Sequence, residues 1–135
     1  MNPTLIDTDI LSEFLRGNTL LKERFDIHIK EFGFISISII TYYEIYNGLL
    51  YKDAKKQLAK FLEFVKLNKV LLISMKSARL SAEIQADLRK IGREIGHADT
   101  LIAGIALAND LVLVTNNTRH FSRINTLTVE NWMKK

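Results

Sequence analysis

The sequence of 135 residues contains no cysteine, a single proline (Pro3) and no apolar stretch long enough to cross a membrane. Without cysteine the chain can form neither a disulfide nor a thiolate zinc site, which fits a reducing compartment. The N-terminus also lacks the basic segment and apolar run of a secretory signal peptide. These absences predict a soluble, cytoplasmic protein with no membrane partner.

What the chain does contain is an ordinary globular composition, with 47% hydrophobic and 25% charged residues. Its length favours a single domain over residues 1–135, large enough to bury a self-sufficient core. The formal net charge is +4. This modest basic excess is compatible with a polyanionic partner but does not identify one by itself.

Strand-like and helix-like patterns alternate along the chain. Short, almost wholly apolar runs predict five strands, at residues 4–7, 34–38, 70–73, 111–115 and 126–129. Apolar residues at helical spacing predict helices at residues 8–16, 20–30, 39–51 and 100–108. Two further helices are expected, one that Asp53 caps and that runs to residue 67, and a long one that opens at Ser74 or Ser77. A loop with two glycines spans residues 92–98, and Asp99 is expected to start the helix after it.

This alternation predicts an α/β protein, a three-layer α/β/α sandwich with a mostly parallel five-stranded sheet. Strands that alternate with helices form crossover units, and a parallel sheet needs cover on both faces. In such open sheets, binding sites lie just beyond the carboxyl ends of the strands, where the strand order reverses. The polar residues that follow each strand are therefore the first candidates for a functional site.

Acidic residues occur at several of these places. Asp7 follows the first strand, Glu44 lies early in the helix after the second, and Asp99 precedes the helix that leads to the fourth. Clustered carboxylates raise one another's pKa, and a divalent cation reverses this penalty. An all-oxygen set favours Mg²⁺ or Mn²⁺. Each acid alone is equally compatible with helix capping or with a solvated surface, so the pattern leaves both a metal site and separate caps open.

Three segments also carry a resemblance to a known family. They read LIDTDILSEFL, SIITYYEIYNGL and GHADTLIAGIALANDLVLVTNNTRHFSRI. Together they resemble the PIN-domain family, and more narrowly the VapC-type toxin ribonucleases of bacterial toxin–antitoxin pairs. The resemblance covers nearly the whole chain. Its most specific part is D-x-x-I-A-x-I-A followed by L-V-T-x-N-x-R-x-F.

The resemblance implies a metal-dependent endoribonuclease. Asp7, Glu44 and Asp99 match the acids that bind Mg²⁺ or Mn²⁺ in the family. Asn117 falls where many members carry a fourth acid, and an amide can offer an oxygen or hold a bound water but carries no charge. The departure at Asn117 puts a tightly bound second metal in doubt. The same resemblance implies a homodimer and a VapB-type antitoxin that covers the acidic site.

Further residues are expected to support this site. The resemblance implies that the hydroxyls of Thr41 and Thr115 hydrogen-bond to the acidic cluster. Asp9 is expected to cap the first helix or to orient Asp7. His28 and His120 are expected to be structural or exposed, since a bound metal can activate water without a histidine base.

Three cations are candidates for contact with the RNA backbone. Arg89 and Arg93 lie at the end of the long helix before the loop that leads to Asp99, and Arg119 lies two residues beyond Asn117. Contacts of this kind would depend on salt concentration. Each cation is equally compatible with a solvated helix end.

Two other classes of function compete with the nuclease interpretation. The stretch Asp7-Thr8-Asp9 also fits the DxD motif of haloacid-dehalogenase-like phosphatases, in which the first acid is a nucleophile. That family needs a late acidic pair, which the sequence does not provide, and the acid pattern of a receiver domain is absent as well. The second class is a non-catalytic binding module whose acids only cap helices.

Overall fold

The computed structural model describes residues 1–134, in which a five-stranded sheet has the order β3-β2-β1-β4-β5. The strands are β1 (Thr4–Ile6), β2 (Ser36–Ser38), β3 (Lys69–Leu71), β4 (Val112–Val114) and β5 (Val129–Glu130). The helices are α1 (Thr8–Leu15), α2 (Thr19–Phe32), α3 (Ile39–Tyr51), α4 (Lys55–Leu67), α5 (Met75–Lys90), α6 (His97–Ala108) and α7 (Thr118–Phe121). Every strand pairing is parallel, so the predicted fold class is confirmed and the sheet is parallel throughout.

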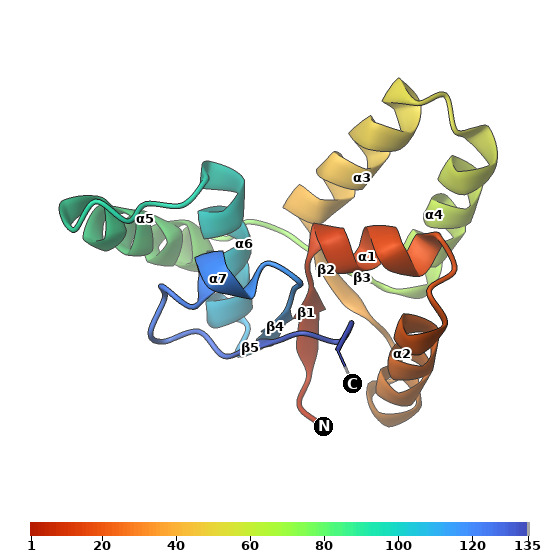
Figure 1. The fold of residues 1–135 in the computed structure, drawn as a ribbon, viewed down its shortest axis with the longest axis horizontal. Helices are drawn as coiled ribbons and strands as arrows, with labels where there is room; N and C mark the ends of the chain where they lie inside the picture. Colours follow the sequence, from red (N-terminus) through yellow and green to blue (C-terminus); the bar gives the residue numbers. More distant parts are fainter. Residues whose placement is uncertain (135) are drawn as a thin grey trace.

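Two hydrophobic cores cover the two faces of the sheet. Because successive strand residues point to opposite faces, Leu5 belongs to one core and Ile6 to the other. The Leu5 core includes residues of α5, α6 and α7, and the Ile6 core includes residues of α1, α2, α3 and α4. The α3–α4 hairpin and α5 diverge from each other on opposite sides of the sheet (Figure 1).

The order of the strands places β1 at the centre of the sheet. The chain passes from β1 to β2 and β3 on one side, then returns to β4 on the other side of β1. The switch point of the topology therefore lies between β1 and β4. At this point the backbone N–H of Asp7 donates to the carbonyl of Val114 across 2.9 Å. The first residues beyond these two strands, Asp7 and Thr115, are neighbours.

The structure corrects three of the predicted helix caps. The side chain of Asp7, not that of Asp9, caps α1. Helix α6 begins at His97 with Gly96 as its N-cap, so Asp99 lies within the first turn and does not start the helix. Asp53 does not cap α4, because its φ of 54° places it in the left-handed region, in the turn before the helix.

The start of α5 was predicted as one of two serines, and both take part. Ser74 is the N-cap, and its hydroxyl accepts from the backbone N–H of Ser77 across 3.0 Å. The hydroxyl of Ser77 in turn accepts from the backbone N–H of Ser74 across 2.9 Å. This reciprocal capping box satisfies two backbone donors that the helix leaves free.

Helices α5 and α6 approach each other at Gly104, where their contact leaves no room for a side chain. A Cβ atom added at Gly104 would collide with the hydroxyl of Ser81 and lie 2.5 Å from the carbonyl oxygen of Ser77. The position of α6, and of the first turn that carries Asp99, therefore depends on this contact. None of the helices in residues 1–134 is both long and apolar enough to cross a membrane.

Candidate active site

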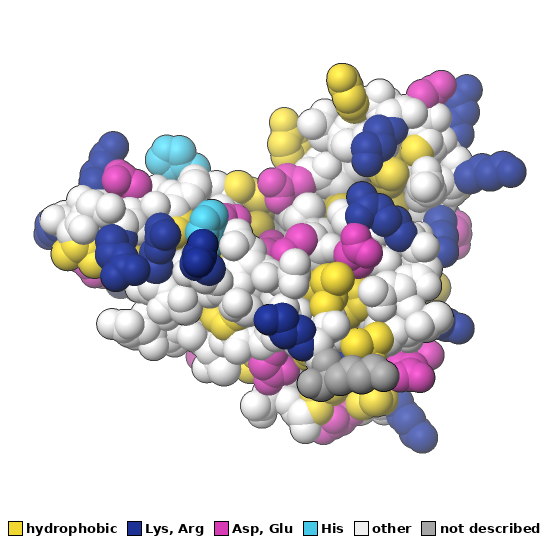
Figure 2. Space-filling view, viewed as in Figure 1, with side chains coloured by type: hydrophobic (Ala, Val, Ile, Leu, Met, Phe, Trp, Pro, Cys, Tyr) yellow, Lys and Arg dark blue, Asp and Glu magenta, His cyan; other side chains and the backbone are white. Residues whose placement is uncertain are grey.

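The three predicted acids come from different elements that meet at the carboxyl end of the sheet. Asp7 directly follows β1, Glu44 lies in α3 after β2, and Asp99 lies in the first turn of α6. Asp9, in the first turn of α1, adds a fourth carboxylate. Figure 2 shows acidic side chains on the floor and walls of a notch between the part that carries α5 and the part that carries α3 and α4. Lys and Arg side chains surround this notch (Figure 2).

Asp7 is the most enclosed of these acids, with 5% of its surface exposed. One carboxylate oxygen accepts from the backbone N–H of Thr8 across 2.8 Å, and the other accepts from the hydroxyl of Thr115 across 2.7 Å. The pKa of Asp7 is raised to about 7: burial and the charges of Asp9 and Asp99 raise it, and the two hydrogen bonds lower it in part. Asp7 is thus both a helix cap and an acid held at a high pKa, so the two interpretations of the sequence do not exclude each other.

Asp9 ties α1 to the segment after β4. Its carboxylate accepts from the backbone N–H of Ile10 across 2.8 Å and from that of Asn116 across 3.1 Å. Burial raises its pKa, and the charge of Asp99 adds to the effect. The predicted capping role of Asp9 is wrong, since Asp7 is the cap. Its charge nevertheless acts on the same group of carboxylates.

Glu44 is connected to the site through a threonine that the sequence did not single out. The hydroxyl of Thr8 donates to Glu44 Oε1 across 2.6 Å and lies 2.9 Å from the hydroxyl of Thr41. Thr41 is itself 3.3 Å from the hydroxyl of Ser38. Thr41 thus reaches Glu44 through Thr8, where a direct bond to an acid was expected. The place of Thr8 between two acids in the D-T-D stretch is the feature that could have indicated it.

Asp99 faces a histidine that was expected to be structural or exposed. Asp99 Oδ2 lies 3.5 Å from His120 Nδ1, and the side-chain amide of Asn117 lies 2.9 Å from the same ring nitrogen. The backbone N–H of Asn117 donates to the hydroxyl of Thr115 across 2.9 Å. The amide of Asn117 is therefore engaged with His120. The three-residue spacing from Asn117 to His120 was the only indication in the sequence, because it brings both side chains to one face of a helical turn.

The chemistry of this donor set fits a hard divalent cation. Asp7 and Asp9 have raised pKa values, and each feels the charge of Asp99. A divalent cation would favour the charged forms and remove this penalty, and oxygen donors select Mg²⁺ or Mn²⁺ over softer metals. In residues 1–134, however, no three acidic or histidine side chains converge closely enough to enclose an ion together. The chemistry of these carboxylates fits such an ion, but in this structure the side chains lie too far apart to enclose it together.

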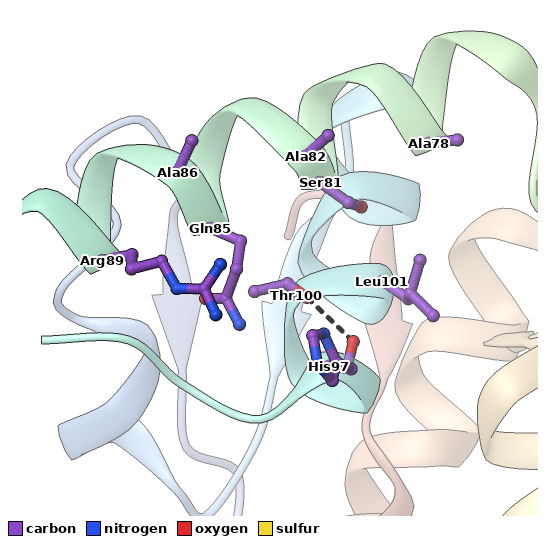
Figure 3. Close-up of a pocket in the computed structure, with 9 residues that line it drawn as sticks. All are labelled: Ala78, Ser81, Ala82, Gln85, Ala86, Arg89, His97, Thr100 and Leu101. Atoms are coloured by element: carbon purple, nitrogen blue, oxygen red, sulfur yellow. Dashed lines mark hydrogen bonds between the residues drawn. The ribbon is translucent and has the colours of Figure 1, made fainter.

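The three candidate arginines do not form one cluster. Arg89 lines a hollow of about 520 Å³ between α5 and α6, and its Nε lies 3.5 Å from Glu94. Figure 3 shows Arg89 and Gln85 extending from α5 toward the first turn of α6. Arg93 lines a separate hollow of about 310 Å³ together with Arg123. Arg119 is exposed on α7.

The fold and the acids at its edge define an α/β protein with a polar site at the topological switch point. The sequence pattern of the PIN domain matches residues 4–127. The chain therefore belongs to the PIN-domain family. The haloacid-dehalogenase-like alternative is not favoured, because this match extends over most of the chain.

Two relatives are similar over nearly their whole length. The tRNA(fMet)-specific endonuclease VapC of Shigella flexneri is 33% identical over 130 residues, which cover 95% of this chain and 96% of that protein. Ribonuclease VapC2 of Haemophilus influenzae is 31% identical over 131 residues, which cover 96% and 97%.

Two solved structures have the same fold as this chain. The crystal structure of DNA-bound VapBC from Salmonella typhimurium matches with a TM-score of 0.89 and 30% identity, over 98% of this chain and 99% of that chain. FitAcB from Neisseria gonorrhoeae matches with a TM-score of 0.84 and 28% identity, over 98% and 99%.

Proposed function

We propose that this protein is a metal-dependent endoribonuclease that acts as the toxin of a VapBC-type toxin–antitoxin module. One observation carries the proposal: Asp7, at the switch point of a PIN-domain sheet, is buried, and the charges of Asp9 and Asp99 act on it. Burying a carboxylate near other negative charges is unfavourable, and a positive ligand removes this penalty. The relatives from Shigella flexneri and Haemophilus influenzae carry the names of an endonuclease and a ribonuclease.

Asp7, Asp99 and Glu44 are the residues proposed to hold Mg²⁺ or Mn²⁺. When bound, such an ion supplies a reactive water and neutralises the charge that develops on the phosphate. Thr8 and Thr115 orient the carboxylate of Asp7, and Thr8 orients Glu44, so both acids are prearranged by the chain. Hydrolysis forms a bond between water oxygen and phosphorus and breaks the bond to the 3′ oxygen, which takes up a proton. The products carry a 5′-phosphate and a 3′-hydroxyl.

The proposed partners are RNA, a VapB-type antitoxin and a second copy of the chain. Arg89, Arg93 and Arg119 are the proposed contacts to the RNA backbone. For protein partners, α3 offers an apolar hollow of about 420 Å³ lined by Tyr42, Tyr43, Tyr46 and other residues. Tyr43 is 65% exposed, and exposed aromatic side chains of this kind are enriched in protein interfaces. The proposed location is the cytoplasm.

The direct test compares wild type with Asp7→Asn on total RNA, with Mg²⁺ and with EDTA. Loss of a metal ligand is expected to reduce cleavage on the order of a thousandfold, as several kcal/mol of charge stabilisation are lost. Asn can still cap α1, so circular dichroism should show an unchanged fold. Asp26→Asn, an exposed acid on α2, is the matched control and should cut like wild type.

Each competing function predicts a different result in this experiment. A non-catalytic binding module would leave RNA intact with every variant. A phosphatase would hydrolyse a small phosphomonoester and leave RNA uncut. Either outcome refutes the proposed nuclease.

A further inference from the structure

The short helix α7 begins with a side chain that does not cap it. Asn117 occupies the N-cap position, yet its side chain makes no cap hydrogen bond. An asparagine at this position usually accepts from a backbone N–H two or three residues further on. Here its amide instead lies 2.9 Å from Nδ1 of His120. The side chain therefore holds an imidazole ring and does not stabilise the helix directly.

The same ring nitrogen also faces Asp99. His120 Nδ1 lies 3.5 Å from Asp99 Oδ2, and the side chains of the two residues are 43% and 28% exposed. A neighbouring carboxylate favours the tautomer that carries its hydrogen on Nδ1. Asn117 can then present its oxygen to this N–H, which needs only a half-turn of its terminal amide. In this arrangement one N–H of His120 points toward two acceptors.

The backbone around this contact is fixed at both ends. Phe121, next to His120, is fully buried in the core on the α6 side of the sheet. The N–H of Asn117 donates to the hydroxyl of Thr115, which donates to Asp7. A series of contacts thus runs from Asp7 through Thr115, Asn117 and His120 to Asp99. In this series the imidazole lies between Asn117 and Asp99.

We propose that His120 is a positioning residue that holds the carboxylate of Asp99, and that Asn117 acts by bracing His120. The imidazole faces Oδ2 of Asp99 and leaves the other oxygen available to an ion. A neutral amide at position 117 braces the ring without adding negative charge beside Asp99, whereas an acid there would add it. This inference rests on the proposed function, because it gives Asp99 the role of a metal ligand.

The first test measures ion binding alone, without RNA. Mn²⁺ is titrated into wild type, His120→Ala and Asn117→Ala, and the concentration that gives half of the rise in Tm is recorded. Loss of a group that orients a ligand typically weakens metal affinity, so each variant should need about tenfold more Mn²⁺. Because both residues act through one contact, the double variant should be no weaker than His120→Ala. His97→Ala, an exposed histidine in the first turn of α6, should match wild type.

The second test measures RNA cleavage at saturating Mn²⁺. A positioning role lowers kcat and leaves KM for RNA unchanged, and His120→Gln, which keeps a side-chain donor, should restore part of kcat. A half-point for Mn²⁺ equal to that of wild type would overturn the proposal. So would a raised KM with unchanged Mn²⁺ affinity, which would make His120 a contact to RNA.

Three further outcomes distinguish a purely structural role of His120, a failure of the proposed function and a failure of the positioning role. If His120→Ala lowers Tm in EDTA, and activity and Mn²⁺ affinity fall with it without rescue by Gln, the role is only structural. If wild type binds Mn²⁺ but leaves RNA uncut, the nuclease function fails while the effect of His120 on Mn²⁺ still tests the positioning role. If Mn²⁺ does not raise the Tm of wild type at all, the positioning role is refuted.

Discussion

The two sides of the acidic site are built in different ways. On the sheet side, Asp7 is 5% exposed and both of its oxygens accept hydrogen bonds from the chain. On the helix side, Asp99 has a 28% exposed side chain and a 3.5 Å contact with His120. The sheet side is thus hydrogen-bonded and desolvated, while the helix side depends on how α6 packs against α5. The difference shows that one acid is fixed by strand pairing and the other by helix packing.

The enclosed position of Asp7 should give the protein a stability that falls as pH rises. Burial and neighbouring acids raise the pKa of Asp7 from 3.8 to about 7. Between these values the folded state keeps a proton that the unfolded state has released, so the free energy of unfolding decreases through this window. The full effect is at most about 4 kcal/mol above pH 7. Urea unfolding in EDTA, measured at several pH values, checks this expectation.

Asp7→Asn separates this effect from the titration of other groups. The asparagine in this variant has no carboxyl group that titrates. The free energy of unfolding of the variant should therefore fall less than that of wild type between pH 3.8 and about 7. The Asp26→Asn control should follow wild type across the whole range. Parallel curves for wild type and Asp7→Asn would mean that Asp7 titrates normally and that the enclosed side of the site is not desolvated.

The helix side should respond to a change in the contact between α5 and α6. Alanine in place of Gly104 would put a Cβ 2.5 Å from the backbone oxygen of Ser77, so the helices must separate. Overpacking of this kind is expected to destabilise the fold by about 1–3 kcal/mol. It should also move the first turn of α6, and with it Asp99, so the concentration of Mn²⁺ needed to raise Tm should increase.

Gly48→Ala is the matched control for this prediction. Gly48 lies in α3, and no atom lies within 4 Å of a Cβ added there. Alanine is the better helix former, so this variant should be unchanged or more stable by about 0.5–1 kcal/mol. Equal unfolding free energies for the two variants would show that α6 is not held by the glycine contact.

The fold was predictable because its sheet is parallel and covered on both faces. Doubly covered strands must be apolar, so each stands out from the polar segments around it, and the helices between them show amphipathic spacing. The edge at which the acids gather then follows from the rule that sites lie beyond the carboxyl ends of parallel strands. The predicted positions of Asp7 and Thr115 needed only this rule.

Details that depend on local backbone or side-chain rotation were not predictable. Asp53 looked like a helix cap, but its left-handed backbone conformation puts it in a turn. The hydroxyl of Thr8 turns toward Glu44, and the ring of His120 turns toward Asp99. The orientations of Thr8 and His120 depend on contacts with residues far apart in the sequence, which no local pattern encodes. The sequence pattern predicts where the site lies, whereas the hydrogen bonds within the site follow only from the folded chain.

The smallest expected effect concerns the hydroxyl that connects the two sides of the site. Thr115 donates to Asp7 and accepts from the N–H of Asn117, so Thr115→Val removes both hydrogen bonds without a large change in shape. The hydrogen bond lowers the pKa of Asp7, so its loss should raise that pKa further and shift the pH-dependent loss of stability to higher pH. The accompanying loss of stability is about 1 kcal/mol. Thr19→Val, at an exposed position in α2, is the control, and it should change neither the pH dependence of stability nor the free energy of unfolding. If Thr115→Val weakens Mn²⁺ binding no more than Thr19→Val does, the sheet side and the helix side act independently, and Thr115 does not join them.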